Sequence, residues 1–519
     1  MNVGNMVVSR RFARRQFIQM CAGTLALAAV GCGHGNEGAW DRRSTITVLY
    51  PSEELWGLPA LFLLFLPLMR RNTKGDLEGW LAKSWEHSAD YREWTCHLRK
   101  DIRWHDGVPV TAQDVKFSLD LFANSALAWE SPDEYSVSVL DDRSYSIIFH
   151  KRPVDWWKDY MVFYPRHLLE NLDPKKFYEW EFWKHPVGNG PYRYVRSMPK
   201  TMMELEANPD YYRGKPKIDR VVLKFGEPML TELLSGNVDV IPWVKEMDLL
   251  KITGDPRFRA YSTVEPDHIR ALVWNQRCPL FRDAKIRRAL TLAINRQELH
   301  QVLNLPKETP VFDVIFTREQ FRRGELPVPL PYDPSAARRL LDEAHWRDTD
   351  GDGIRDREGK SFHFTALVKT EEDLDKAAVY IQAELRRVGI RMDISALEAE
   401  TAAARIKTGD FEAAVTIVNE DIEGPGGHIE FFGEGSLIGY RNSRVAALLN
   451  QAAKSLNPGE SDRIYRELAP IFRAALPATF LFPLVRTTVA HRRVRGMSSP
   501  YREDPVWYMD ELWLDDRSA

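Results

Sequence analysis

Apolar and polar residues alternate most clearly in the stretch from Leu81 to Leu119. Trp94, Cys96 and Leu98 fall on one side of an extended chain with polar residues between them, which predicts a strand with one buried face. A short second strand is expected around Ile102 to Trp104, because a tight turn can form directly after it.

A turn and a helix are predicted to follow. Asp106-Gly107 tolerates the left-handed conformation of a tight turn. Thr111 and Asp114 have the spacing of a capping box, and Val115 and Leu119 recur at helical spacing. This stretch is therefore expected to fold as strand, turn, strand and capped helix.

The C-terminal half shows an alternation of strand and helix patterns. Strands are predicted over 362–368, 390–397 and 411–418, and helices over 373–388 and from Thr401, each helix ending at a glycine, Gly389 or Gly409. This order is a βαβαβ unit, whose strands end where α/β folds present ligands. Strands are also predicted at 44–50 and 220–225, and helix starts at Asp283, Asn295 and Asp333-Pro334.

Composition indicates a globular chain. The 519 residues are 44% hydrophobic and 28% charged, which is enough to bury large cores in two or three domains. The net charge is only −3, so electrostatics gives no reason to expect a nucleic acid as partner.

The N-terminus has the pattern of an export signal. Arg14 and Arg15 resemble a twin-arginine motif, although a basic start of a general secretory signal is the alternative. The apolar run from Cys21 to Val30 is too short to span a bilayer. Ala29-Val30-Gly31-Cys32 resembles a lipobox, which would make Cys32 the lipidated first residue of the mature chain. The signal is then expected over 1–31 and a polar tether over 32–43.

Two cysteines remain beyond this segment. Cys96 is expected to act as a small core residue, and a disulfide between Cys96 and Cys278 is the alternative in an oxidising compartment.

The run from Asp348 to Asp356 has the look of a calcium loop, with carboxylates at alternate positions. Position twelve, however, is Gly359, where a bidentate Glu would belong. We therefore expect a solvent-exposed turn, with calcium as the alternative, and predict no metal site and no cofactor.

Several of these motifs resemble one family. Leu81-Ala82-Lys83-Ser84-Trp85, the segment from His105 to Leu119 and Gly188-Asn189-Gly190-Pro191-Tyr192 are similar to the signature of the extracytoplasmic solute-binding proteins, family 5. The resemblance runs from about Ser44 to Met497. Members of this family are binding components of ABC importers for peptides, nickel and related solutes.

The resemblance implies a two-lobed α/β fold of the type II periplasmic-binding-protein class, with an extra domain inserted in the first lobe. Lobe I is expected to combine 44–76, 187–271 and 487–519, with the inserted domain at 77–186 and lobe II at 272–486.

The resemblance also implies a ligand site between the lobes. The segment beginning Gly409-Asp410-Phe411 is similar to one in peptide-binding relatives, and Asp421 falls on the aspartate that meets the ammonium group of the ligand there. The alternative is that Asp421 only caps a turn. Glu420 beside it would favour a cationic group if it faces the ligand.

Trp274 and Asn275 lie at the crossover between the expected lobes. There an aromatic ring can stack on a ligand and backbone groups can bind an extended peptide, with packing at the hinge as the alternative.

We find no phosphate loop, HExxH, GxSxG or CxxC motif, so the chain is not expected to be an enzyme. The expected function is that of a monomeric, lipid-anchored extracytoplasmic receptor that captures di- or oligopeptides and delivers them to an ABC permease. The alternatives are a receptor for a nickel or other metal chelate, a binding lipoprotein linked to a sensor, and a hydrolase on the same scaffold.

Overall fold

The computed structural model describes residues 42–51, 57–72, 76–124, 135–150, 161–244, 246–307, 309–370, 373–419, 426–455, 457–497 and 505–515. The predicted signal and tether, with Arg14, Arg15 and Cys32, lie outside these residues. The chain forms two compact units, unit 1 (Met1–Thr263 with Arg486–Ala519) and unit 2 (Val264–Val485). Both divisions fall within long strands, β12 (Phe258–Trp274) and β18 (Ala478–His491), so the chain passes from one unit to the other twice.

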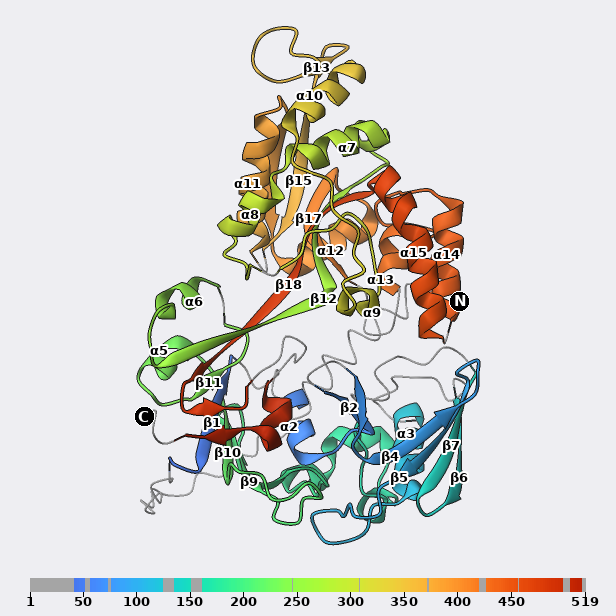
Figure 1. Cartoon of the computed structure of the whole chain (residues 1–519), viewed down its shortest axis with the longest axis vertical. Helices are drawn as coiled ribbons and strands as arrows, with labels where there is room; N and C mark the ends of the chain where they lie inside the picture. The colour runs from blue at the N-terminus through green and yellow to red at the C-terminus, as the bar shows by residue number, and fades with distance from the viewer. Residues whose placement is uncertain are drawn as a thin grey trace. The chain divides into compact units, whose positions relative to one another are not determined.

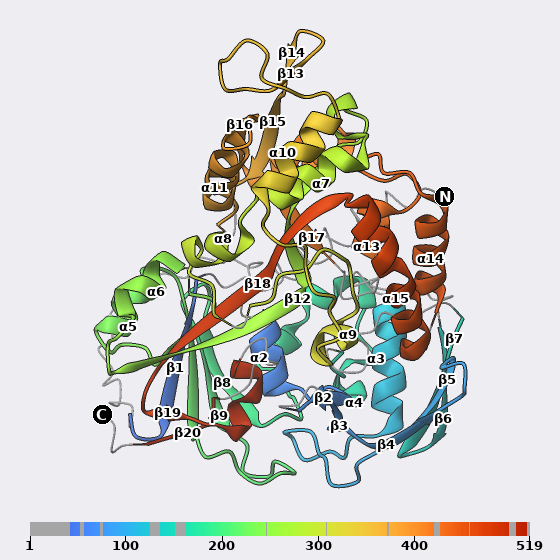
Figure 2. The same ribbon diagram turned by 45° about the horizontal axis from the view of Figure 1, so that its top comes forward.

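Unit 1 is built around β1 (Thr45–Tyr50), which pairs in parallel with β10 (Arg220–Phe225) and β11 (Val240–Ile241). The sheet continues antiparallel through β9 (Met202–Ala207) to β8 (Tyr192–Met198) (Figure 2). The β-branched and apolar residues of β1 suit a strand covered on both faces, and nearly all of them are buried. The strands predicted at 44–50 and 220–225 are thus confirmed.

A second, antiparallel sheet of unit 1 has the order β4 (Ala82–His87), β5 (Glu93–Leu98), β7 (Ser144–Phe149) and β6 (Tyr135–Asp141). Helix α3 (Ala112–Asn124) packs against it (Figure 2).

The buried face predicted for β5 is confirmed, because Trp94, Cys96 and Leu98 are all at most 5% exposed. The capped start of α3 is confirmed as well, since the Asp114 carboxylate accepts hydrogen bonds from the backbone N–H and the hydroxyl of Thr111 at 2.7 and 3.1 Å.

The second strand predicted around Ile102 is wrong. Only Arg103 forms a β-bridge, with Pro109, because the tight turn at Asp106-Gly107 leaves little chain to pair. Ile102 and Trp104 are nevertheless buried in the core.

The other elements of unit 1 surround these sheets. They are α2 (Gly57–Leu64), β2 (Met69–Arg71), β3 (Leu77–Gly79), α4 (Arg166–Leu169), η3 (Pro174–Glu179), η4 (Glu181–Lys184), α5 (Met229–Leu234), α6 (Glu246–Ile252), β19 (Val494–Arg495), η6 (Pro505–Glu511) and β20 (Trp513–Leu514). One hydrophobic cluster joins residues of both sheets, from Ile46 of β1 to Ile147 of β7. The limits predicted for the inserted domain and the lobes therefore stay predictions.

Unit 2 contains the predicted βαβαβ order: β15 (His363–Lys369), α11 (Leu374–Arg386), β16 (Arg391–Leu397), α12 (Ala399–Thr408) and β17 (Ala413–Asn419). The three strands are parallel, and β12 pairs antiparallel with β17 (Figure 1).

The predicted ends of both helices are confirmed by positive φ angles, 83° at Gly389 and 74° at Gly409, which glycine adopts without strain. Helix α12 begins earlier than predicted, because the Glu398 carboxylate accepts from the backbone N–H groups of Glu400 and Thr401.

The remaining elements of unit 2 are η5 (Pro279–Phe281), α7 (Ala284–Ala293), α8 (Arg296–Val302), α9 (Arg318–Arg322), α10 (Pro334–Glu343), β13 (Asp356–Arg357), β14 (Lys360–Ser361), α13 (Gly426–Phe432), α14 (Ser443–Lys454) and α15 (Pro458–Ala475). Figure 2 shows α14 and α15 side by side. Asp283, Asn295 and Asp333 cap α7, α8 and α10 through their side chains, as predicted. In the described part of the chain, every helix is too short or too polar to cross a bilayer.

Both described cysteines are free thiols, so the alternative of a disulfide is not realised. Cys96 is fully buried, and this burial raises the pKa of its thiol to about 12.

Candidate functional site

The carboxyl ends of the parallel strands of unit 2 lie along one edge of its sheet. β15, β16 and β17 end at Lys369, Leu397 and Asn419, and β12 places His268 opposite Asn419. The Nδ1 atom of His268 lies 3.7 Å from a carboxylate oxygen of Glu265. An imidazole and a carboxylate therefore lie close to each other near the edge where an α/β sheet presents its ligands.

The acidic residues predicted to bind ligand follow this edge directly. Glu420 and Asp421 are the first two residues after β17, and both lie outside the described residues. Their role stays a prediction, but the strand that leads into them ends at the edge where that role requires it.

Trp274 and Asn275 do not lie at this edge. Trp274 pairs with Ala413, the first residue of β17, while 420 and 421 follow its last residue. Seven strand residues separate the two ends, which corresponds to about 20 Å. Trp274 therefore lies at the opposite end of β17 from Asn419, the last described residue before Glu420 and Asp421.

Both side chains are engaged in packing. Trp274 is 0% exposed, and its ring lies 5.0 Å from that of Phe281. The side-chain amide of Asn275 donates to the carbonyl oxygens of Phe411 at 2.6 Å and Gly409 at 3.2 Å. Both side chains thus contact neighbouring residues of unit 2 beside the start of β17. The ligand contacts predicted for Trp274 and Asn275 are not supported by this geometry.

Unit 1 has its own carboxyl edge, and three side chains meet on it. β1 ends at Tyr50, and Trp243 follows β11 by two residues, with its ring edge-on to that of Tyr50 at 6.0 Å. The guanidinium carbon of Arg486, on β18, lies 5.9 Å from the centre of the Trp243 ring. Tyr50 is fully buried, whereas Trp243 and Arg486 are half-buried and so reach the surface.

Trp243 also has a rare backbone conformation. Its φ angle is +54°, in the left-handed region, where a bulky residue is strained, and such strain is common at binding sites. The next residue fixes this conformation, because the N–H of Val244 donates to the carbonyl oxygen of Thr487 at 2.7 Å. The sequence prediction missed Trp243. The only signal was an aromatic residue shortly after a strand, which also describes many core residues.

In the acidic loop 348–356 of unit 2, two carboxylates accept hydrogen bonds from other residues of the same loop. Asp348 accepts hydrogen bonds from the N–H groups of Gly351 and Gly353, and Asp356 accepts from Thr349. Asp348, Asp350 and Asp356 still hold one oxygen each within 4.8 Å of one another. This arrangement agrees with an exposed turn and by itself does not establish a calcium site.

Known proteins are similar to this chain in sequence and in fold over most of its length. The oligopeptide-binding protein AppA of Bacillus subtilis is 25% identical over 482 residues, which cover 87% of this chain and 86% of AppA. Its structure with a nonapeptide superposes with a TM-score of 0.64 and 21% identity, covering 91% of this chain and 99% of AppA.

Two further structures superpose more closely. NikZ of Campylobacter jejuni, in complex with Ni(L-His), gives a TM-score of 0.70 at 24% identity and covers 91% of this chain and 99% of NikZ. The ABC transporter substrate-binding protein CtaP of Listeria monocytogenes gives 0.75 at 19% identity, with the same coverage.

These superpositions confirm the predicted fold class, a two-lobed α/β fold with a domain inserted in the first lobe. Residues 76–436 match the family described as bacterial extracellular solute-binding proteins, family 5 Middle, which is a family of binding proteins and not of enzymes. The chain therefore belongs to the bacterial extracellular solute-binding proteins of family 5.

Proposed function

We propose that this protein is the extracytoplasmic receptor of an ABC importer and that its solute is a di- or oligopeptide. The observation that supports this proposal is that β17 ends at the carboxyl edge of three parallel strands, and that Glu420 and Asp421 are the next two residues in the sequence. A peptide brings an α-ammonium group, for which adjacent carboxylates in a partly dry site supply charge-assisted hydrogen bonds.

Within unit 1, Trp243 and Arg486 have side chains whose chemistry suits contacts with a peptide. A half-buried indole offers a flat apolar surface to a peptide side chain, and a guanidinium group matches a terminal carboxylate in shape and charge. AppA, which is similar over most of the chain, was solved with a nonapeptide, which supports peptides as the class of solute. We therefore propose Asp421 and Glu420 of unit 2 as ligand contacts and, as a separate proposal within unit 1, Trp243 and Arg486.

A nickel chelate is the second candidate. NikZ carries Ni(L-His), and His268 lies at the carboxyl edge of unit 2, where an imidazole could ligate nickel. We prefer peptides because His268 has Glu265 as its neighbour and the clustered groups that could hold a metal among the described residues are the three carboxylates of the 348–356 loop.

Native mass spectrometry of gently purified protein tests the proposal. We expect a ladder of peptide masses that is lost in Asp421→Ala and reduced in Trp243→Ala. Asp410→Ala is the matched control, because this exposed carboxylate pairs with Arg405 at the surface, and it should keep the ladder. A single metal-complex mass that persists in Asp421→Ala would refute both the peptide proposal and the role of Asp421.

We further propose that the protein is a monomer anchored to the outer side of the cytoplasmic membrane through a lipid on Cys32 and that it docks on an ABC permease. The support is the lipobox-like sequence before Cys32 and the structural similarity to CtaP, an ABC transporter substrate-binding protein. Cys32→Ala should move the protein from the membrane fraction to the soluble fraction. Unchanged membrane association of this variant would contradict the anchor.

A further inference from the structure

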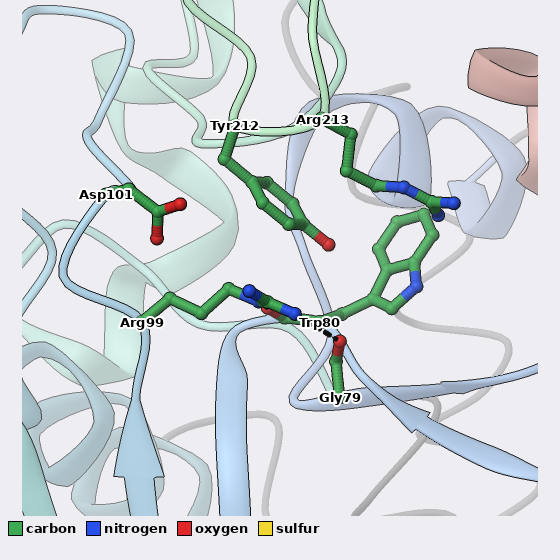
Figure 3. A pocket seen from close by; sticks show the side chains of 6 residues that line it. All are labelled: Gly79, Trp80, Arg99, Asp101, Tyr212 and Arg213. Carbon is green, nitrogen blue, oxygen red and sulfur yellow. Dashed lines mark hydrogen bonds between the residues drawn. The ribbon is translucent and has the colours of Figure 1, made fainter.

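Unit 1 contains a polar hollow of about 330 Å³ that none of the roles above uses. Its lining is shown in Figure 3 and consists of Gly79, Trp80, Arg99, Asp101, Tyr212 and Arg213.

This hollow lies away from the proposed solute contacts of unit 1. Tyr212 and Arg213 belong to the loop between β9 and β10, whose backbone closes beside Asp219, at the amino end of β10. Trp243 and Tyr50 lie at the carboxyl end of the same parallel strands. The hollow and the carboxyl edge are therefore at opposite edges of the sheet of unit 1.

Backbone carbonyl groups hold Arg99 in place, and part of its guanidinium group makes no hydrogen bond to the described residues. Its Nε donates to the carbonyl oxygen of Trp80 at 2.9 Å, and its Nη2 donates to that of Gly79 at 3.4 Å. The guanidinium carbon lies 4.9 Å from the centre of the Tyr212 ring. Within the described part of the chain Arg99 forms no ion pair, so its remaining N–H groups are available to an anion.

Arg213 supplies a second cation. It makes no hydrogen bond to any described residue, and its guanidinium carbon lies 5.6 Å from the centre of the Trp80 ring. Asp510 and Glu511 approach Arg213 only to 3.8 and 3.7 Å, because both hydrogen-bond to the buried Arg70. Arg70 also stacks on Trp80, at 3.4 Å, and so fixes the floor of the hollow.

Tyr212 adds a neutral donor between the two arginines. In Figure 3 its hydroxyl lies between the guanidinium groups of Arg99 and Arg213, and it has no hydrogen-bond partner among the described residues. Burial raises the pKa of Tyr212, so the hydroxyl stays protonated at neutral pH and can donate. Asp101 lies on the side of Tyr212 away from Arg213.

We propose that this hollow is a second ligand site, which binds a small organic monocarboxylate. Two guanidinium groups and a phenol hydroxyl present N–H and O–H donors to one carboxylate, for which arginine is the best-matched side chain. The six lining residues carry a net charge of +1, and the carboxylates of Asp510 and Glu511 next to Arg213 reduce the positive charge further, which favours a single negative charge over a dianion. The site is independent of the solute contacts proposed above.

Isothermal titration calorimetry of the full chain with benzoate and butyrate tests this site. Arg213→Gln removes a charged donor and should weaken binding roughly 10-fold or more, and Tyr212→Phe, which removes one neutral donor, roughly 2- to 12-fold. Both variants should fold normally, because neither group hydrogen-bonds within the described chain, and thermal unfolding checks this. Asp101→Asn should strengthen the binding of succinate, a dianion, relative to butyrate.

Two controls separate this site from others. Arg259→Gln removes the same charge from an exposed arginine of β12 and should leave benzoate binding unchanged. Trp243→Ala should also leave it unchanged, even if it abolishes peptide binding. Absence of binding heat in the unaltered chain, or equal affinities of Arg213→Gln, Tyr212→Phe and the unaltered chain, would overturn the proposal.

Discussion

His105 shows how one partly buried side chain joins two motifs that are far apart in the sequence. Its Nδ1 accepts a hydrogen bond from the N–H of Gly188 at 3.1 Å, and its Nε2 lies 3.1 Å from the carbonyl oxygen of Gly190, so the ring is neutral with the proton on Nε2. Burial lowers the pKa of His105 from 6.5 to about 4, and the charge of Arg193 adds to this shift.

This lowered pKa predicts a loss of stability in mild acid. Between pH 6.5 and 4 the unfolded chain binds a proton at His105 and the folded chain does not, so the free energy of unfolding decreases as the pH decreases. The loss should reach about 3 kcal/mol at pH 4. Urea unfolding of the unaltered chain and of His105→Asn from pH 4 to 7 measures it. Equal pH dependence of the two proteins would show that His105 does not cause the loss.

Gly188 is required for close approach of two backbones. A Cβ atom at this position would lie 1.9 Å from the carbonyl oxygen of Leu64, to which Asn189 and Gly190 donate their N–H groups.

Gly188→Ala should therefore lower the free energy of unfolding by about 3 kcal/mol or more, because the clash is with backbone. Gly459→Ala is the control, since its Cβ would meet only a side-chain atom, at 3.2 Å, and it should cost less than about 1 kcal/mol. Urea unfolding measures both, and equal small losses would refute the requirement.

At the scale of elements, a buried ion pair joins β1, β11 and the chain after β18. Arg493 donates two hydrogen bonds to the Asp239 carboxylate, at 2.7 and 2.8 Å, and a third to the carbonyl oxygen of Thr45. Asp239 also accepts from the N–H of Thr47. The side chains of Asp239 and Arg493 are only 8% and 11% exposed.

Breaking this pair should be costly. Arg493→Met leaves the Asp239 charge buried and should lower the free energy of unfolding by about 3–5 kcal/mol, whereas Asp239→Asn combined with Arg493→Met should cost much less than the sum of the single changes. The exposed pair Lys116–Asp120 on α3 is the control, with a coupling of about 0.5 kcal/mol or less. A coupling this small for Asp239 and Arg493 would show that the pair does not join these elements.

Some elements could be predicted from local sequence and others could not. Helices α7, α8 and α10 were predicted from capping residues, and α11 and α12 from glycines at their ends, because these signals act within one turn. The strand predicted around Ile102 was wrong because the tight turn at Asp106-Gly107 leaves only the bridge between Arg103 and Pro109.

At the scale of the whole molecule, solute binding should be linked to folding. A peptide that binds only the native chain stabilises it by mass action, by about 2.7 kcal/mol when its free concentration is 100 times its dissociation constant. Thermal unfolding with peptides identified by mass spectrometry should show this gain in the unaltered chain and a smaller one in Trp243→Ala at the same concentration. No shift at a saturating peptide concentration would contradict the proposed function.

The sequence by itself determined the family and the order of elements in the βαβαβ unit, because these depend on motifs and on the local spacing of apolar residues. It also predicted Asp421, the second residue after β17, as a ligand contact. Only the tertiary structure decided which distant residues share an edge. It separated Trp274 and Asn275 from the end of β17, since antiparallel pairing placed them at its start. It brought Tyr50, Trp243 and Arg486 together, and likewise Arg99, Tyr212 and Arg213, because sheet pairing and loop packing join segments whose spacing along the chain carries no such information.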